Sequence, residues 1–321
     1  MKAAIHTQYG PPDVVHIRDI SKPSPATNEI LVRVYAGTVN RTDCGFRSAE
    51  YFVSRFFSGL FKPRQQILGC EFSGIVESVG ESVHTYQAGD RIFGFNDTRF
   101  GGHAEYLLRD EHDAMTLIPE NLSFEETAAL TEGSHYALCN IRAAKVQAGQ
   151  KVMVYGATGA IGSAAVQLLK YFNAGVTAVC NTPHVDLVRS LGADDVIDYT
   201  REDFTKTTQQ YDFIFDAVGK SSFGVCKKLL KKDGIYISTE PGKNAENIWL
   251  ALYGFLSGGR RVLFPIPYIN KEDVIFLKNL AEKGLFKPLI DRTYPLDEIR
   301  EAYQYVESRQ KIGNVVLKIS S

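Results

Sequence analysis

An apolar run that leads into three glycines at three-residue spacing is the feature that most constrains this chain. Residues 152–155 read Val-Met-Val-Tyr, and Gly156, Gly159 and Gly162 follow before an amphipathic stretch. Glycine permits a sharp reversal from strand to helix and lets backbone N–H groups approach a phosphate. Because a helix N-terminus favours negative charge, the pattern predicts a dinucleotide-binding turn. The spacing departs from the commoner G-x-G-x-x-G, so this motif needs support from its surroundings.

The segments that follow the turn alternate between helix and strand patterns. Apolar residues recur at helical spacing from Ile161 to Phe172, and residues 176–180 have the pattern of a buried strand. Further strand patterns cover 195–198, 211–216 and 234–238. Repeated alternation of this kind predicts a parallel, doubly wound α/β sheet.

The first part of the chain has the texture of a β-barrel. Strand-like runs at 29–35 and 72–79 are separated by Gly/Pro turns, with one helical insertion expected around 43–60. A capping box at Ser123 and Glu126 marks a helix start where the α/β part is expected to begin.

The last residues are expected to return to the first domain. A helix is predicted from Asp297 to about Glu307, followed by a strand at 314–319. We therefore expect two domains, one formed by 1–120 and 292–321, and the other by 121–291.

Composition excludes several kinds of partner. With 36 basic and 37 acidic residues, the formal net charge is −1, which argues against nucleic acid or an anionic membrane. The five cysteines form no C-x-x-C pair and no secretory leader is recognised, so we expect a reduced, cytoplasmic protein. No stretch approaches the roughly 18 uninterrupted apolar residues of a membrane helix. The expected partner is a small molecule.

Short motifs in a fixed order resemble those of the medium-chain dehydrogenase/reductases. They are Met1-Lys2-Ala3, Val39–Asp43, Gly69–Gly74, Gly89–Ile92, Gly102–Tyr106 and Gly313–Val316. With the glycine turn they span almost the whole chain, and they are most similar to the zinc-free quinone oxidoreductases and the related alkenal/enone reductases. The resemblance implies a GroES-like β-barrel domain, a Rossmann domain, a nicotinamide cofactor and a homodimer.

Two departures from the zinc-dependent members bear on metal binding. Where those members have a cysteine and a histidine, this chain has Asn40 and Cys70, and it lacks their lobe of four closely spaced cysteines. Catalytic zinc needs three protein ligands and a water, whereas Cys70 and Glu71 offer two. We expect no metal, and for Cys70 the role of a small buried residue.

The expected absence of a metal favours acceptors that already spread negative charge. Quinones and α,β-unsaturated carbonyls take hydride on a conjugated carbon, and the charge appears on an oxygen that one hydrogen-bond donor can stabilise. Reduction of such an acceptor by NADPH is the leading hypothesis. Two alternatives stay open: a metal-free alcohol or carbonyl oxidoreductase of the same superfamily, and an NADPH-binding protein with little turnover.

Four residues are candidates for the substrate side of the site. The resemblance implies that Asn40 faces the nicotinamide and donates to a substrate oxygen, although a turn asparagine after a strand is the alternative. Asp43 orients Asn40 or relays a proton, or it is an ordinary acidic residue at a helix start. Tyr51 and Phe57 are candidates for a substrate wall and equally for a core. We assign no chemistry to His103.

The end of the second strand of the α/β part decides the choice of cofactor. NAD-specific sites place Asp or Glu about 20 residues after the glycine turn. Here the residues are Asn181, Thr182 and His184, with Arg189 close behind, a set that suits a 2′-phosphate and favours NADPH. Asp186 is better explained as first-turn helix charge.

The remaining cofactor candidates come from the turn and from the resemblance. The turn supplies Gly156, Thr158, Gly159, Ala160, Ile161 and Gly162, and the resemblance implies Thr131, Tyr199, Val218 and Gly219.

Overall fold

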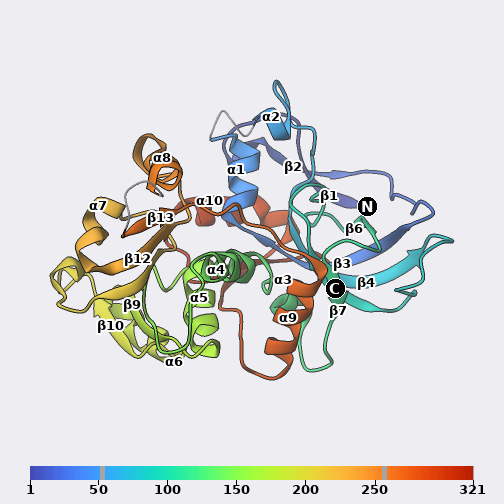
Figure 1. Cartoon of the computed structure of the whole chain (residues 1–321). Coiled ribbons are helices and arrows are strands. Elements are labelled where there is room, and N and C mark those ends of the chain that lie inside the picture. Colours follow the sequence, from blue (N-terminus) through green and yellow to red (C-terminus); the bar gives the residue numbers. More distant parts are fainter. Residues whose placement is uncertain (51–54, 255–258, 321) are drawn as a thin grey trace. The chain divides into compact units, whose positions relative to one another are not determined.

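The computed structural model describes residues 1–50, 55–254 and 259–320, and the chain forms two compact units (Figure 1). Unit 1 comprises Met1–Glu132 and Ile269–Ser321, and unit 2 comprises Gly133–Tyr268. The first segment of unit 1 thus ends at residue 132, later than the expected residue 120. Its second segment begins at residue 269, earlier than the expected residue 292. The capping box at Ser123 and Glu126 and the expected limit at residue 291 assigned the stretches around residues 124 and 271 to the α/β part, but a local pattern does not reveal which sheet a helix covers.

Unit 1 is built mainly from strands. Its elements are β1 (Lys2–His6), β2 (Val15–Asp19), β3 (Glu29–Val39), α1 (Arg41–Ser48), α2 (Arg55–Ser58), β4 (Glu71–Val79), β5 (Arg91–Phe95), β6 (Tyr106–Asp110), β7 (Met115–Leu117), α3 (Phe124–Ala128), α9 (Lys271–Glu282), β14 (Ile290–Pro295), α10 (Ile299–Glu307) and β15 (Asn314–Lys318). The helical insertion predicted around 43–60 corresponds in the described residues to the short helices α1 and α2.

The long strand β3 organises the sheets of unit 1. In the described residues the larger sheet has the order β14-β15-β3-β4-β5-β7, with β6 also paired to β3, and β1 and β2 form a two-stranded sheet. The terminal strand β15 pairs antiparallel with β3, from Val315 opposite Val39 to Lys318 opposite Ala36. The terminal strand thus lies in the same sheet as β3, next to the first strands of unit 1.

Both helices that the sequence assigned to the other domain pack on unit 1. Ala128 and Ala129, at the end of α3, lie in one buried cluster with Ala36 of β3 and Val316 of β15. Helix α9 packs against β7. The capping box predicted at α3 is present, because the Ser123 side chain accepts from the Glu126 backbone and Glu126 accepts in return.

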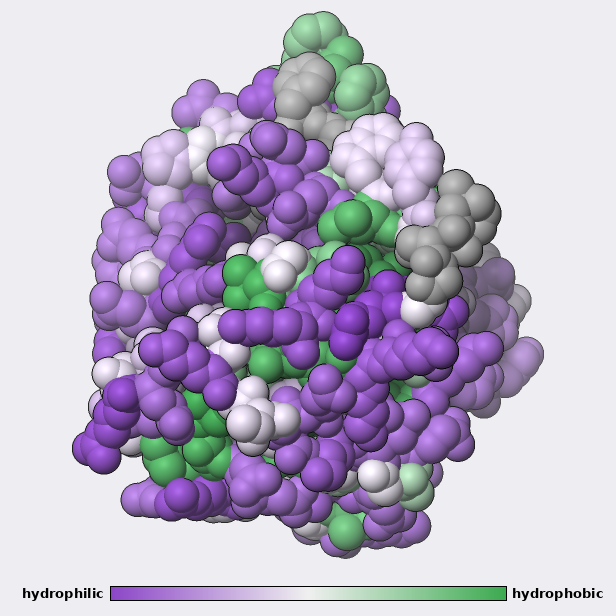
Figure 2. Space-filling model, turned by 60° about the vertical axis from the view of Figure 1, so that its left-hand side comes forward, coloured by the Kyte–Doolittle hydropathy of each residue, from purple (hydrophilic) through white to green (hydrophobic). Residues whose placement is uncertain are grey.

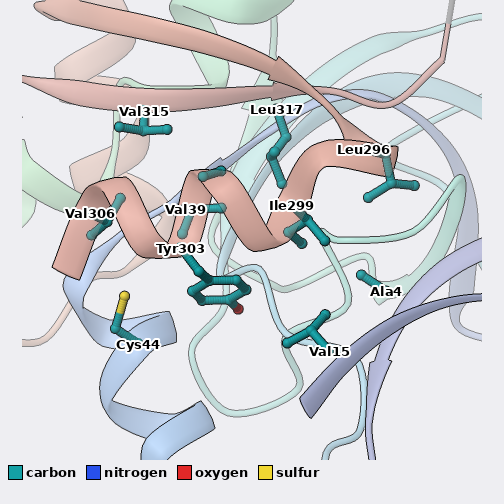
Figure 3. Close-up of a cluster of buried hydrophobic side chains, with 11 residues drawn as sticks. Ala4, Val15, Val39, Cys44, Leu296, Ile299, Tyr303, Val306, Val315 and Leu317 are labelled. Atoms are coloured by element: carbon teal, nitrogen blue, oxygen red, sulfur yellow. The ribbon is translucent and has the colours of Figure 1, made fainter. Parts of the chain in front are cut away.

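Helix α10 covers the junction of β3 and β15 with one apolar face. Ile299, Ala302, Tyr303 and Val306 follow the i, i+3, i+4, i+7 spacing and are all buried. Figure 3 shows Ile299, Tyr303 and Val306 beside Val39, Val315 and Leu317, and the Tyr303 ring lies between Cys44 of α1 and Val15 of β2. Each large buried side chain contributes about 1.5 to 3 kcal/mol, so this cluster fixes the start of α1 beside the end of β3.

Unit 2 is a doubly wound α/β fold, as predicted. Its elements are α4 (Glu132–Ala143), β8 (Lys151–Tyr155), α5 (Ala160–Tyr171), β9 (Gly175–Cys180), α6 (Val185–Ser190), β10 (Asp195–Asp198), β11 (Tyr211–Asp216), α7 (Phe223–Cys226), β12 (Leu230–Ser238), α8 (Glu246–Tyr253) and β13 (Arg261–Leu263). All strand pairs described in its sheet are parallel, in the order β10-β9-β8-β11-β12-β13. The predicted strands at 195–198 and 211–216 match β10 and β11.

The strand order of unit 2 fixes where a ligand can bind. The strands β8, β9 and β10 follow one another in the sheet in chain order. The next strand, β11, then pairs with β8 on its opposite edge. Ligands of such sheets bind beyond the carboxyl ends of the strands at the point where the order reverses. Here that point lies between the ends of β8 and β11.

The surface shows no large hydrophobic face in the view of Figure 2, where hydrophilic side chains dominate and hydrophobic ones form separate small areas. Among the described residues, no helix has both the length and the apolar character that a membrane span requires.

Candidate functional site

The glycine turn of unit 2 leaves room for a phosphate. Gly156 has a φ of +81°, and a Cβ on Gly162 would lie 2.1 Å from the Gly156 carbonyl oxygen, so neither position accepts a side chain without distortion. Gly159 is the N-cap of α5, where no side chain caps the helix. The nearest atom to a Cβ on Gly159 would be 3.8 Å away. The first turn of α5 therefore offers backbone donors and a favourable dipole to a pyrophosphate.

The residues expected to choose the cofactor lie directly after β9. The His184 Nδ1 and Asn181 Oδ1 atoms are 2.5 Å apart, so these two side chains form one polar group. Arg189 stands in the last turn of α6, with 61% of its side chain exposed and one nitrogen 3.7 Å from Asp186. Asp186 occupies the first turn of α6, as predicted.

Thr182 has a neighbour that the sequence analysis did not single out. Its hydroxyl donates to Asp198 Oδ2 at 2.5 Å and lies 2.7 Å from the Thr200 hydroxyl. Asp198 ends β10, which pairs with β9, so the sheet register brings this carboxylate beside Thr182. Tyr199, the next residue, is half exposed. The polar group after β9 thus contains an acid as well as the donors expected for a 2′-phosphate.

In unit 1, Asn40 and Asp43 form a capping box at the start of α1. Asn40 Oδ1 accepts from the Asp43 backbone N–H at 2.9 Å, and Asp43 Oδ2 accepts from the Asn40 backbone N–H at 3.1 Å. The other Asp43 oxygen accepts from the Gly69 N–H at 2.9 Å. The Asp43 carboxylate thus binds the backbone N–H of Asn40 and holds Asn40 in position.

Burial controls the protonation of Asp43 and its neighbour His103. Burial raises the pKa of Asp43 to about 7, and it lowers the pKa of His103 to about 4. The imidazole Nε2 is 3.9 Å from Asp43 Oδ2, but a neutral histidine makes no ion pair there. The same Nε2 instead donates to the Thr38 carbonyl at 2.7 Å. His103 is thus a buried structural histidine.

The Asn40 amide nitrogen points toward Cys70. Asn40 Nδ2 donates to Cys70 Sγ at 2.9 Å and is 3.5 Å from the Thr38 hydroxyl. Sulfur is a weak acceptor and the second distance is long, so the amide keeps donor capacity. Burial raises the pKa of the Cys70 thiol, which therefore stays protonated.

These residues do not fit a zinc site. A zinc site needs at least three Cys, His, Asp or Glu ligands, whereas the side chain beside Cys70 Sγ is the Asn40 amide, which donates to the sulfur. Within residues 1–50, 55–254 and 259–320, no three His, Cys, Asp or Glu side chains could together hold a metal ion.

Glu71, next to Cys70, accepts several hydrogen bonds from Thr131 and Glu132 at the end of the first segment of unit 1. Its Oε1 accepts from the Thr131 N–H, the Thr131 hydroxyl and the Glu132 N–H at 3.0, 2.7 and 2.6 Å, and its Oε2 accepts from the Thr38 hydroxyl at 2.5 Å. Because Glu71 accepts from both the N–H and the hydroxyl of Thr131, this buried carboxylate fixes Thr131, a constraint that the sequence analysis missed.

Burial and the neighbouring Glu71 raise the pKa of Glu132, and the charge of Lys311 opposes that rise.

The substrate-wall residues cannot be placed. Tyr51 lies outside the described residues, and for Phe57 the structure describes only the backbone, within α2.

Two family models match most of the chain. Residues 26–146 match the alcohol dehydrogenase GroES-like domain, and residues 191–317 match the family described as zinc-binding dehydrogenase. The chain belongs to the medium-chain dehydrogenase/reductase superfamily, in its quinone oxidoreductase branch. The zinc in the name of the second family has no matching ligand set among the described residues.

Three similar proteins illustrate the branch. A 2-methylene-furan-3-one reductase of Solanum lycopersicum is 29% identical, over 99% of this chain and 79% of its own length. A chloroplastic NADPH-dependent alkenal/one oxidoreductase of Arabidopsis thaliana has the same identity and the same coverage of both chains. The structure of a quinone oxidoreductase from Coxiella burnetii superposes with a TM-score of 0.88 at 25% identity, covering 100% of this chain and 99% of that one.

Proposed function

We propose that this protein is a zinc-independent oxidoreductase that transfers hydride from NADPH to a quinone or an α,β-unsaturated carbonyl compound. The observation that carries the proposal is the contact between Asn40 Nδ2 and Cys70 Sγ. It joins the two positions at which zinc-dependent relatives are expected to bind their metal. The names of similar proteins support the same acceptor class.

The cofactor half of the proposal rests on the glycine turn and the polar group after β9. NADPH, when bound, supplies the hydride. The uncapped start of α5 binds the pyrophosphate through backbone N–H groups. His184 and the exposed Arg189 are the groups that would face a 2′-phosphate, and charge-assisted bonds of this kind are the strong ones. The Asp198 carboxylate would repel the phosphate, so the preference for NADPH depends on the positive charge of Arg189.

On the acceptor side, Asn40 is the proposed donor to the developing oxyanion. Its Oδ1 is held by the cap of α1 and its backbone by Asp43, so the amide is fixed before substrate arrives. A preorganised donor stabilises charge without reorganisation during the reaction. The Cys70 thiol, a weak acceptor, is the partner that the amide would exchange for a substrate oxygen.

The test is an acceptor panel. The oxidation of NADPH is followed by absorbance with quinones, enones and unconjugated aldehydes, in the presence and absence of a chelator. We expect turnover with the first two classes and no effect of the chelator. Rapid reduction of unconjugated aldehydes, without activity on any quinone or enone, would refute the acceptor class.

A further inference from the structure

We propose that Asp216 is a positioning residue for the nicotinamide half of the cofactor. Its carboxylate holds the loop formed by residues 217–221 in the conformation that receives this half. The inference rests on the proposed function, because it requires that unit 2 binds NADPH.

The Asp216 side chain accepts hydrogen bonds from the backbone of the loop that follows it. Asp216 is the last residue of β11 and is fully buried. Its Oδ1 accepts from the N–H groups of Val218 and Lys220 at 3.2 and 3.3 Å, and its Oδ2 accepts from the Ser221 N–H at 2.9 Å. The Tyr236 hydroxyl donates to the same Oδ2 at 3.2 Å. One carboxylate therefore satisfies three backbone donors of a five-residue loop.

The Tyr236 hydroxyl holds the carboxylate from the neighbouring strand. Tyr236 lies in β12, which pairs with β11, and it is fully buried. Burial and the charge of Asp216 raise the pKa of Tyr236, so its hydroxyl remains a donor. The loop is thus tied to the sheet through Asp216.

The loop lies directly against the glycine turn. A Cβ on Gly156 would come within 2.5 Å of the Val218 side chain, so the two segments touch. Gly219 has a φ of +64°, and a Cβ there would come within 2.2 Å of the Glu240 side chain. A shift of the loop toward Gly156 or toward Glu240 would therefore cause a collision.

The strand order decides which half of a dinucleotide the loop can serve. Each half of such a sheet holds one nucleotide beyond the carboxyl ends of its strands. The half with β8, β9 and β10 carries the polar group after β9, which is the candidate for the adenosine ribose and its phosphate. The loop after β11 lies in the other half. By this geometry it serves the nicotinamide nucleotide.

The experiment compares two probes on Asp216→Asn in the full chain. NADPH contains both nucleotides, whereas 2′,5′-ADP contains only the adenosine half and its 2′-phosphate. Asparagine keeps the size of the side chain. It replaces Oδ2 with an NH₂ group, which cannot accept from the Ser221 N–H and the Tyr236 hydroxyl. We expect the Kd for NADPH, measured by calorimetry, to rise about 10- to 100-fold, and that for 2′,5′-ADP to stay within about twofold.

The matched control is Asp212→Asn at the other end of the same strand. Asp212 Oδ2 accepts from the Lys151 N–H at 2.8 Å and pairs with the Lys231 ammonium at 2.7 Å, far from the carboxyl ends of the strands. This change should lower thermal stability at most and leave the ratio of the two dissociation constants unchanged. Tyr236→Phe removes one of the four bonds to Asp216 and should weaken NADPH by about three- to tenfold, again without affecting 2′,5′-ADP.

The outcomes separate this inference from the proposed function. Wild-type protein that binds neither NADPH nor 2′,5′-ADP would overturn the proposed function and, with it, the role of the loop. If the wild type binds both probes, an Asp216→Asn variant that weakens both equally, or neither, overturns the positioning role alone. If that variant does not fold, Tyr236→Phe decides: unchanged NADPH affinity overturns the inference.

Discussion

Replacing Asn40 by alanine should destabilise unit 1 as well as alter turnover, because one side chain serves both the helix and the proposed site. Alanine removes the acceptor of the Asp43 N–H, a bond of 2.9 Å, and the donor to Cys70 Sγ, a bond of 2.9 Å. With 3% of Asn40 exposed, water cannot take over these bonds. The loss should therefore exceed that of an exposed cap.

The expected cost follows from the burial of the cap. Replacing an N-cap by alanine costs about 0.5 to 2 kcal/mol, and a buried donor left without a partner costs about 1 to 3 kcal/mol. Both ranges describe the loss of the same hydrogen bond, so they are not added. We expect the free energy of unfolding to fall by about 2 kcal/mol. For a unit of this size that corresponds to a fall in the unfolding midpoint of about 4 to 8 °C.

Two matched variants separate the cap from the chemistry. Asn40→Ser keeps a capping oxygen but has no amide, so it should retain most of the stability. Ser123→Ala removes the exposed capping box of α3, in which Ser123 Oγ accepts from the Glu126 N–H at 3.1 Å, and should cost about 0.5 to 1 kcal/mol without affecting turnover. Scanning calorimetry gives the midpoints, and NADPH oxidation gives the rates.

Turnover discriminates between the two roles of Asn40. If the amide donates to the oxyanion, both Asn40→Ala and Asn40→Ser should reduce turnover about 10²- to 10³-fold while the affinity for NADPH changes little. A midpoint equal to the wild type in Asn40→Ala would refute the argument from the cap. Wild-type turnover in both variants would refute the proposed donation.

Three further predictions concern cofactor, metal and pH. Arg189→Ala should raise the Kd for NADPH about tenfold or more and leave that for NADH nearly unchanged, since a charged hydrogen bond is worth about 1.5 to 3 kcal/mol; equal losses would make Arg189 structural. Elemental analysis of the purified protein should find no stoichiometric zinc, and about one zinc per chain, lost together with activity on chelation, would contradict this. Because burial lowers the pKa of His103 to about 4, this residue alone should lower the free energy of unfolding by about 3 kcal/mol as the pH falls from about 6.5 to 4, whereas burial of Asp43, which raises its pKa to about 7, acts in the opposite direction over the same range. Denaturant titrations should therefore show the stability of wild type relative to His103→Gln falling by that amount over this pH range, and a difference that does not change with pH would exclude a role of His103.

The fold could be predicted from the sequence because its signals are local. The glycine turn, the strand patterns of unit 2 and the capping box of α3 each depend on a few consecutive residues, and the structure confirms all of them. Domain limits depend on which surface a helix covers. Nothing within the sequence of α3 indicates that Ala128 packs beside Val316 of β15.

Residues that act through long-range contacts were missed for the same reason. Glu71 accepts from Thr131 and Glu132, some sixty residues away in the sequence. No motif around Glu71 or around Thr131 predicts these hydrogen bonds. Asp216 had a weak signal, an acid at the end of a strand three residues before Gly219. Its bonds to the following backbone could have been suspected from that spacing alone. Asp198 became visible only when the register placed it beside Thr182.

The chain order of unit 1 has a consequence for folding during synthesis. Unit 2 is inserted between Glu132 and Ile269, and β15, at the end of the chain, fills the place beside β3. Until residues 314–318 leave the ribosome, residues 36–39 of β3 form an unpaired edge and the cluster under α10 lacks Val315 and Leu317. Such an edge can pair with other chains. Unit 2 can complete its sheet first, whereas unit 1 closes last through contacts of very high sequence separation, which are slow to form.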